Sequence, residues 1–295
     1  MRIAFLGLGA IGTPMAVHVA KQHQLAVWNR TGSKAAAFGA AHPCTVAATP
    51  REAAAGAEVV ITCLPTSSDV DGLLDGPDGL LAGMARGTLF LDCTSGDPET
   101  TRKIGARLAP LGIDFADAPV SGGTNGAEAG TLTVMVGGTE QVFRRARPVL
   151  ECFGRRVEHM GPLGAGHAMK AVNNALLAAN MLALGEGLVA LVKSGIPARK
   201  AVEVLNASSG RSFVSETLVP ERVLTRLWPL TFRLALLDKD ARIAAGFLAG
   251  QGVSGPVLHL TSELLRQAHA MLGEEADYLE PIRLIEQEAG VELHE

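Results

Sequence analysis

A lysine and an asparagine in the second half of the chain stand at the spacing of one helical turn. Lys170 and Asn174 are four residues apart, and on a helix such residues project from the same face, with Asn173 alongside. Residues 168–177 are otherwise almost entirely apolar, which predicts a helix that is buried on all sides. Burial disfavours the charged form of a lysine and lowers its pKa toward neutrality. The sequence therefore predicts a general acid/base at Lys170, the alternative being a lysine that reaches solvent.

A second polar segment combines a hydroxyl with two glycines. The segment 117–126 follows a predicted strand and contains Ser121, Gly122 and Gly123 in succession. Such a run can direct consecutive backbone N–H groups and a hydroxyl at a carboxylate. The segment therefore predicts an anion site, the alternative being a glycine-rich connector with no ligand.

A glycine-rich turn follows the first predicted strand and opens a helix. Its residues are Gly7-Leu8-Gly9-Ala10-Ile11-Gly12. In dinucleotide-binding domains the first glycine of this pattern permits a tight turn, the second lets the backbone approach the pyrophosphate, and the third lets helix and strand pack closely. The start of the helix also offers unpaired N–H groups to the anion. The position after the first strand predicts a dinucleotide site; without that context a structural turn would look the same.

The end of the second predicted strand bears on the choice between the two nicotinamide coenzymes. A domain for NAD normally places Asp or Glu there, whereas this chain has Asn29, Arg30 and Thr31. Arg30 can pair with a ribose 2′-phosphate and pack on adenine, with Asn29 and Thr31 as further donors. We therefore predict NADP(H) as the preferred coenzyme, with NAD(H) bound more weakly. If Arg30 points into solvent instead, the two coenzymes should bind equally well.

Hydroxyl groups also end another predicted strand. In the run Asp92-Cys93-Thr94-Ser95 they can meet the nicotinamide end of a coenzyme, or cap the next helix. His167 lies three residues before Lys170 but has no recognisable acidic partner, which favours a solvated or structural histidine. The sequence contains no metal-ligand spacing and no Gly-x-Ser-x-Gly turn, so no metal site is predicted. Hydride transfer assisted by a lysine needs neither.

Positioning these groups requires a parallel sheet followed by helices. In the first half, apolar runs that barely alternate are separated by helical patterns, as is typical of a parallel sheet covered on both faces. Strands are expected at residues 2–6, 24–28, 58–63, 88–92, 114–116 and 131–136. From about Gly161 onward, helices are expected at 165–193, 198–208, 233–249, 257–272 and 278–288. The basic groups at 144–147 and 155–156 are expected at solvated helix or strand ends.

These patterns predict an α/β fold in which a doubly wound Rossmann domain precedes an all-α domain. Residues 1–161 are expected to bind NADP, and residues 162–295 to form an all-helical domain for substrate binding and oligomerisation. The short apolar segment 161–166 predicts that the two domains pack and share a cleft. A helical half built on one long apolar helix leaves hydrophobic surface for a homodimer or homotetramer.

The composition of the chain argues against several other classes of protein. The 295 residues carry a formal net charge of −4, which offers no positive field for nucleic acid or an acidic membrane. The four cysteines lie far apart, which indicates neither a disulfide framework nor a zinc site and favours a reducing cytoplasm. The N-terminal run lacks the cleavage site of a signal peptide. The apolar stretch 175–192 carries Asn180 and Glu186, which a bilayer would penalise, so no membrane partner is expected.

Four separated segments together resemble the β-hydroxyacid dehydrogenase family, which includes 3-hydroxyisobutyrate dehydrogenase and glyoxylate/succinic semialdehyde reductases. In the family's order, they are residues 7–12, the Asp-Ala-Pro-Val-Ser-Gly-Gly run at 117–123, the pattern Gly161-x-x-Gly164-x-Gly166-x-x-x-Lys170-x-x-Asn173-Asn174, and Lys239-Asp240. The resemblance covers nearly the whole chain. It departs from the family at Ile11, where methionine is usual, and at Thr94-Ser95, which reverses the usual order. The related 6-phosphogluconate dehydrogenases are considerably longer.

The resemblance implies a role for each matching residue. Lys170 corresponds to the catalytic acid/base, and the substrate is held by Ser121, Gly122, Gly123 and Asn174. In addition to residues 7–12 and 29–31, the implied coenzyme contacts are Leu64, Pro65, Lys239 and either Thr94 or Ser95.

The implied reaction is hydride transfer between NADP and a small 3-hydroxy acid, as in 3-hydroxyisobutyrate dehydrogenase. The enzymatic alternative is an NADPH-dependent reductase of glyoxylate or succinic semialdehyde. A non-catalytic NADP-binding sensor is the alternative from another class, and the presence of Lys170 beside an anion loop argues against it, because a sensor needs no acid/base.

Overall fold

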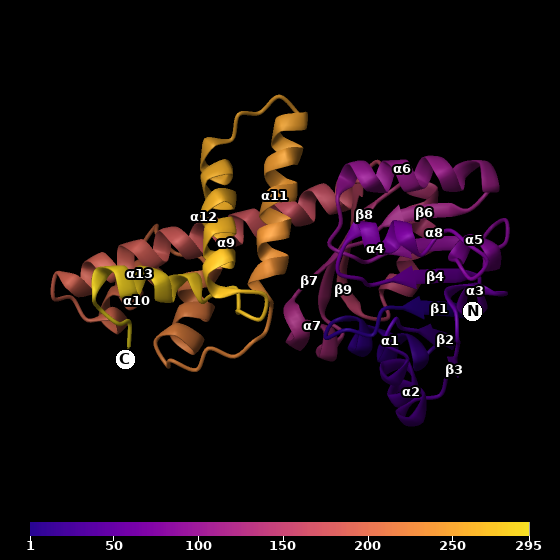
Figure 1. The fold of residues 1–295 in the computed structure, drawn as a ribbon, viewed down its shortest axis with the longest axis horizontal. Helices are drawn as coiled ribbons and strands as arrows, with labels where there is room; N and C mark the ends of the chain where they lie inside the picture. The colour runs from indigo at the N-terminus through magenta and orange to yellow at the C-terminus, as the bar shows by residue number, and fades with distance from the viewer. Residues whose placement is uncertain (295) are drawn as a thin grey trace. The chain divides into compact units, whose positions relative to one another are not determined.

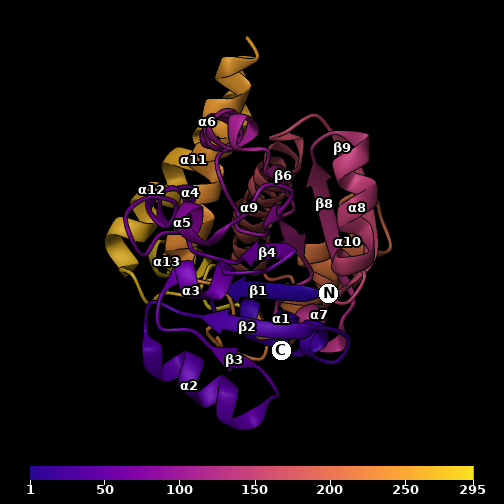
Figure 2. The same ribbon diagram turned by 90° about the vertical axis from the view of Figure 1, so that its right-hand side faces the viewer.

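Within residues 1–294, which this computed structural model describes, nine strands form one sheet. The strands are β1 (Arg2–Leu6), β2 (Gln24–Trp28), β3 (Thr45–Val46), β4 (Val59–Thr62), β5 (Leu89–Asp92), β6 (Asp114–Asp117), β7 (Val120–Ser121), β8 (Leu132–Gly137) and β9 (Gly154–Gly161). Their order is β3-β2-β1-β4-β5-β6-β8-β7, with β9 paired to β8, and Figure 2 shows β3, β2, β1 and β4 side by side. The six neighbouring strands β3, β2, β1, β4, β5 and β6 run parallel, whereas β8 is antiparallel to β6 and β7. The chain turns back at β1, with β2 on one side and β4 on the other, which is the switch of a doubly wound sheet.

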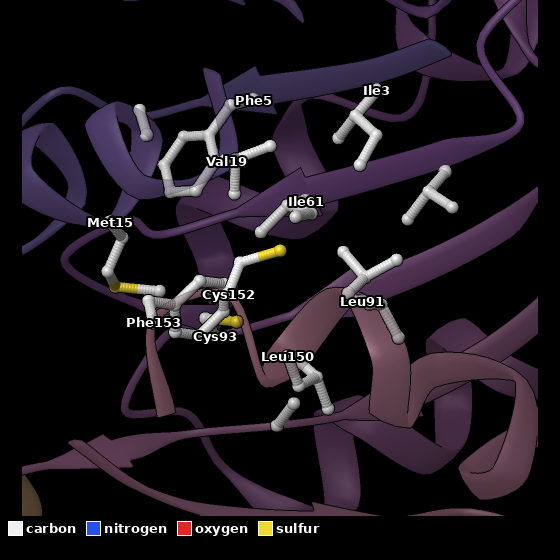
Figure 3. Packing of buried hydrophobic residues seen from close by; sticks show 14 of the residues in the cluster. Ile3, Phe5, Met15, Val19, Ile61, Leu91, Cys93, Leu150, Cys152 and Phe153 are labelled. Atoms are coloured by element: carbon white, nitrogen blue, oxygen red, sulfur yellow. The ribbon is translucent and has the colours of Figure 1, made fainter. Parts of the chain in front are cut away.

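The sheet is buried on both faces because its central strands β1, β4 and β5 are apolar except at one end of each, where Arg2, Thr62 and Asp92 stand. Ile3 and Phe5 of β1 point into one hydrophobic core, and Ala4 and Leu6 point into the other. Figure 3 shows the first core, in which Phe5, Ile61 and Leu91 pack with side chains such as Met15 and Leu150. The expected doubly wound α/β domain is confirmed by this arrangement.

Helices of the first unit connect these strands. They are α1 (Gly12–Ala20), α2 (Gly32–Ala41), α3 (Pro50–Ala54), α4 (Ser67–Gly72), α5 (Leu80–Gly83), α6 (Pro98–Leu108), the 3₁₀ turn η1 (Ala109–Leu111), α7 (Gly123–Ala129) and α8 (Glu140–Leu150). Several begin at a side chain that accepts a bond from the first turn, as Thr139 does from the Val142 N–H of α8.

The second unit is helical, as the sequence predicts. Its helices are α9 (Ala165–Lys193), α10 (Ala198–Asn206), the π-helix η2 (Val214–Val223), α11 (Leu234–Gly250), α12 (Pro256–Leu272) and α13 (Pro281–Ala289). Figure 1 shows α11 and α12 side by side, joined by one connection. Buried residues such as Met181 of α9, Leu237 of α11 and Leu265 of α12 share the hydrophobic core of this unit.

The chain divides into compact units Met1–Lys170 and Ala171–Glu295, so the division falls inside α9. Among the described residues, α9 is the one helix long and apolar enough to cross a bilayer. Because Met181, Leu182 and Leu188 of α9 are buried in the core of the second unit, it has the character of a core helix.

Three features of the fold differ from the sequence prediction. Strands β3, β7 and β9 and the π-helix η2 were not expected, although the basic pair Arg155-Arg156 is exposed near the start of β9, as expected for a solvated strand end. Helix α9 is not buried on all sides, because Met169 is 44 % exposed and Leu176 is 50 % exposed. The last helix begins at Pro281 instead of Tyr278, since the ring of a proline suits the first turn of a helix.

Candidate functional site

The glycines in the turn after β1 differ in whether the surrounding protein has room for a side chain. Gly7 has φ +108°, and a Cβ there would collide with the carbonyl oxygen of Cys63; a Cβ on Gly12 would collide with the carbonyl oxygen of Gly7. A Cβ on Gly9, by contrast, meets no described atom within 4 Å. The protein's own packing therefore requires glycine at 7 and 12 but not at 9. Open space above Gly9 fits a pyrophosphate that lies against the backbone.

The loop after β2 is joined to this turn by one side chain. The Asn29 Oδ1 accepts a bond from the Leu8 N–H at 2.9 Å, and the Asn29 Nδ2 donates to the Thr31 carbonyl oxygen at 3.0 Å. The guanidinium of Arg30 is 80 % exposed and lies 3.3 Å from the carboxylate of Asp69, a residue of α4. Asn29 thus links the two loops, while Arg30 extends beyond them.

Loops after β4 and β5 are also tied together. The buried Thr94 hydroxyl accepts a bond from the Leu64 N–H at 3.1 Å, next to the exposed Pro65. The buried carboxylate of Asp92 accepts from the Thr62 hydroxyl at 2.8 Å and from the Thr94 N–H at 3.1 Å. Of the two neighbouring hydroxyls, that of Thr94 is therefore engaged inside the protein, and Ser95 is half-buried.

These four loops lie at one edge of the sheet. Strands β2, β1, β4 and β5 are parallel neighbours, so their carboxyl ends meet at the same edge, beside the switch between β1 and β4. Open α/β sheets bind their ligands at such a switch point. The sheet thus brings together the predicted coenzyme residues of the first unit.

The anion loop follows the next strand, β6. Ser121 ends the short strand β7, which pairs with β8. Gly122 and Gly123 have φ +138° and +64°, values that glycine adopts without strain, and both are exposed. The loop is therefore open at the same end of the sheet as the coenzyme residues.

Lys170 lies on the second turn of α9 and is 9 % exposed. The helix start is attached to β6, because the Asp117 carboxylate accepts bonds from the N–H groups of Gly164 and His167, each at 2.7 Å. His167 is fully buried, its Nδ1 lies 2.6 Å from the Thr101 hydroxyl, and its Nε2 lies 3.9 Å from the Asp92 carboxylate. Of the two expected alternatives, solvated or structural, the structural histidine is therefore the one observed. His167 does have an acidic neighbour, which the sequence did not indicate, although Asp92 lies too far away for a hydrogen bond.

In the second unit, Asn174 lies on α9 one turn after Lys170 and is almost completely buried. Its Nδ2 donates to the Asp240 carboxylate at 2.6 Å, and its Oδ1 accepts from the Asn173 Nδ2 at 3.1 Å. The Lys239 ammonium lies 3.1 Å from the same Asp240 carboxylate. Asp240 therefore orients two predicted site residues although it was not predicted as one; the Lys239-Asp240 dipeptide was the signal for it.

Other reactive groups at this edge are unsuited to chemistry of their own. Burial, with a smaller contribution from the Asp92 carboxylate, raises the pKa of Cys63 to about 12, and burial raises the pKa of Cys93 well above its usual value. Both thiols therefore stay protonated at neutral pH. Among residues 1–294 no group of three His, Cys, Asp or Glu side chains is placed to hold a metal ion.

Two family models cover most of the chain. One, described as the NAD binding domain of 6-phosphogluconate dehydrogenase, matches residues 2–161. The other, described as NAD-binding of NADP-dependent 3-hydroxyisobutyrate dehydrogenase, matches residues 164–285.

Known proteins resemble the chain over its length. It is 36 % identical over 294 residues to 2-(hydroxymethyl)glutarate dehydrogenase from Eubacterium barkeri, covering 99 % of this chain and 97 % of that protein. It is 41 % identical over 249 residues to NAD-dependent L-serine dehydrogenase from Pseudomonas aeruginosa, covering 84 % and 80 %. The structure of Mycobacterium tuberculosis 3-hydroxyisobutyrate dehydrogenase with L-serine matches with a TM-score of 0.88 and 33 % identity, over 96 % of this chain and 98 % of that one.

Proposed function

The chain belongs to the β-hydroxyacid dehydrogenase family of oxidoreductases, and from this premise we propose that it transfers hydride between NADP(H) and a small 3-hydroxy acid. The observation that carries the proposal is the attachment of α9, with the buried Lys170, to the strand that leads into Ser121-Gly122-Gly123. This attachment holds Lys170 and the Ser121-Gly122-Gly123 loop at one end of the same sheet.

For the coenzyme, we assign binding to residues 1–161, with the turn 7–12 at the pyrophosphate. Leu64, Pro65 and Ser95 line the nicotinamide end in this assignment, and Thr94 supports them through its bond to the Leu64 N–H. We also assign a coenzyme contact to Lys239 of the helical domain, residues 162–295, as the family resemblance implies. When bound, the coenzyme accepts hydride during oxidation and supplies it during reduction.

Preference for NADP(H) is assigned to Arg30. No carboxylate stands at residues 29–31, and the exposed guanidinium can form charge-assisted bonds to a 2′-phosphate. The family description that names an NADP-dependent enzyme is in line with this preference. One relative is named as NAD-dependent, so the coenzyme preference of this chain rests on its own residues after β2.

For the substrate, we assign the carboxylate to Ser121, Gly122 and Gly123. During oxidation Lys170 takes the proton from the substrate hydroxyl, and during reduction it returns that proton to the carbonyl oxygen. Asn174, oriented by Asp240, positions the same oxygen or the lysine.

The names of the relatives narrow the substrate class. 3-Hydroxyisobutyrate, L-serine and 2-(hydroxymethyl)glutarate are all propionates with a hydroxyl at C3 and a substituent at C2. We assign this class to the chain, with the C3 alcohol as the group that is oxidised and the matching semialdehyde as the product.

A homodimer or homotetramer formed through the helical domain completes the proposal. Leu176, Ala183 and Ala190 of α9 are exposed and spaced seven residues apart, which places apolar side chains along one stripe of the helix. The four cysteines are free, in line with a reducing cytoplasm.

Steady-state assays of the full chain test the proposal. The panel contains 3-hydroxyisobutyrate, L-serine, 2-(hydroxymethyl)glutarate and their semialdehydes, with glyoxylate and succinic semialdehyde as competitors, each with NADP(H) and NAD(H). We expect the highest kcat/KM with a C2-substituted 3-hydroxypropionate and NADP. Faster reduction of glyoxylate or succinic semialdehyde would contradict the substrate class, and tight NADPH binding without turnover of any compound would contradict the enzymatic assignment.

A further inference from the structure

The carboxylate of Asp117 is the feature that the proposed reaction leaves without a role. Asp117 is the last residue of β6, is completely buried, and accepts two backbone bonds of 2.7 Å, from Gly164 and His167. A buried charge is costly unless its hydrogen bonds are satisfied. Here the unpaired N–H groups at the start of α9 satisfy it, and the helix dipole favours a negative charge at that position.

The surrounding backbone leaves room for this carboxylate and little else. A Cβ on Gly166 would lie 2.9 Å from the Asp117 Oδ2, and a Cβ on Gly137 would collide with its Oδ1. Glycine at 137 and 166 thus admits the side chain between β8 and the first turn of α9. The close fit means that the carboxylate sets both the position and the direction of that turn.

The same residue joins the two parts that the proposed reaction must align. Asp117 begins the segment that reaches Ser121 four residues later, and it holds the N–H of His167, three residues before Lys170. A second tie, between the His167 Nδ1 and the Thr101 hydroxyl at 2.6 Å, anchors the same turn to α6. One carboxylate therefore connects the anion loop directly with the helix that carries the lysine.

We propose that Asp117 is a positioning residue that holds Lys170 at a fixed position relative to the Ser121-Gly122-Gly123 loop. This inference rests on the proposed function. It assigns Asp117 no contact with substrate or coenzyme, because both of its oxygens are occupied by backbone N–H groups inside the protein.

Asp117→Asn is the direct test, because asparagine has nearly the same shape but only one acceptor oxygen. One of the two N–H groups then faces the amide NH₂, and the first turn of α9 loses a bond. Misplacement of a catalytic group by about 1 Å can lower the rate about 100-fold, so we expect kcat to fall about 10- to 100-fold. The Kd for NADPH, measured by fluorescence titration, should stay within about twofold of the wild-type value, since the coenzyme turn is not attached to Asp117.

An isotope effect separates positioning from loss of stability. With substrate deuterated at the carbinol carbon, a slower chemical step raises the primary isotope effect on kcat above the wild-type value. Thr139→Ala is the matched control, because it removes the cap of α8 (the Val142 N–H bond) and leaves α9 intact. We expect the control to unfold at a lower temperature with unchanged kcat and isotope effect.

Hydrogen exchange tests the same attachment without turnover. Asp117→Asn should speed amide exchange in residues 163–170, and Thr139→Ala should not. If Asp117→Asn does not accumulate as a folded protein, Asp117→Ser takes its place, because a hydroxyl also accepts a single bond.

The outcomes distinguish this inference from the proposed function. Unchanged exchange at 163–170, or a kcat and isotope effect equal to those of the wild type, would overturn the role of Asp117 while the proposed function stands. Failure of the wild type to oxidise or reduce any compound of the panel would overturn the proposed function, and faster exchange in Asp117→Asn would still support the attachment of α9 by Asp117.

Discussion

The two units of the chain treat their large hydrophobic side chains differently. In the first, helices cover both faces of the sheet, and four large hydrophobic side chains are exposed among the described residues. The second unit carries the other ten of the fourteen exposed ones. They are Leu176, Ile196, Val204, Phe213, Leu227, Leu230, Val253, Val257, Leu260 and Met271. A sheet can be covered by its own connecting helices, whereas a small helical unit built on one long helix leaves apolar side chains uncovered.

The units also differ in how they use buried polar groups. In the first unit, buried Thr62, Asp92, Thr94, Asp117 and His167 gather at the carboxyl edge of the sheet, where they tie the loops together. In the second unit, the buried Arg222–Asp277 pair, at 2.7 Å, holds the loop before α11, because Asp277 also accepts bonds from Thr231 and Phe232. Buried charge in the first unit thus lies at the candidate site, whereas in the second unit it serves both the framework, through Arg222–Asp277, and the candidate site, through Asp240.

The largest expected effect concerns the lysine at the end of the first unit. Lys170→Ala should lower kcat about 10²- to 10⁴-fold, because it removes a positioned acid/base, while NADPH still binds. Steady-state kinetics and fluorescence titration measure the two effects. Lys193→Ala, at the far end of the same helix, is the control and should turn over normally; near-normal turnover by Lys170→Ala would refute the acid/base role.

Substitutions at two glycines of the coenzyme turn should have different effects, one on coenzyme binding and the other on stability. Gly9→Ala should unfold at the wild-type temperature but bind NADPH at least about tenfold more weakly, because its methyl group enters space left for the coenzyme. Gly7→Ala should lower the unfolding temperature, since φ +108° is strained for alanine and its Cβ meets the Cys63 carbonyl oxygen. Thermal unfolding and titration of both variants check this. Equal binding of NADPH by Gly9→Ala and the wild type would place the pyrophosphate elsewhere.

Exposed apolar residues should matter in the second unit and not in the first. We expect light scattering to give the wild type a mass that is a multiple of the 30.6 kDa chain. Leu176→Glu should weaken the association about tenfold or more, because it introduces an unpaired charge into the apolar stripe of α9. Leu111→Glu, at an exposed position of the first unit, should leave the mass unchanged. A wild type of 30.6 kDa at micromolar concentration would contradict the proposed oligomer.

The smallest expected effect concerns the exposed ion pair beside the coenzyme loop. Asp69→Asn releases Arg30 and removes a negative charge near the 2′-phosphate, so NADPH should bind about two- to fivefold more tightly, in keeping with a surface pair. NADH, which has no such phosphate, should bind as before. Asp71→Asn, whose carboxylate pairs with Arg107, is the matched control. An equal gain for both coenzymes would show that Arg30 does not contact the phosphate.

Much of the fold could be predicted because its signals are local. The apolar runs predicted at 2–6 and 24–28 coincide with β1 and β2, and the periodicity predicted at 165–193 coincides with α9. Strand β9 was missed because its residues carry charges such as Arg155 and Arg156, which a strand tolerates when its side chains face solvent. The exposed stripe of α9, with Leu176, Ala183 and Ala190, was not predicted. A helix that is apolar on nearly every side carries no polar residues to mark which side faces solvent.

Prediction of the candidate site had a similar limit. The glycine turn, Arg30, the Ser-Gly-Gly loop and Lys170 stood out by type and spacing. Asp240 was part of the Lys239-Asp240 match, but its role was not predicted, because its contact with the Asn174 amide spans 66 residues of sequence. The acidic neighbour of His167 was likewise invisible, since Asp92 comes from a different strand.

By itself, the sequence determined the class of fold, the family and the residue types available for chemistry, because periodicity, glycine spacing and motifs depend on neighbours along the chain. The tertiary structure decided which of those groups meet. Asp117 and Gly164, 47 residues apart, form a hydrogen bond because β6 and the start of α9 come together in the fold. Because the Asp117 carboxylate is buried, it must be satisfied by groups inside the protein, and the N–H groups at the start of α9 satisfy it. This requirement arises from folding, since in the unfolded chain water can solvate the same carboxylate.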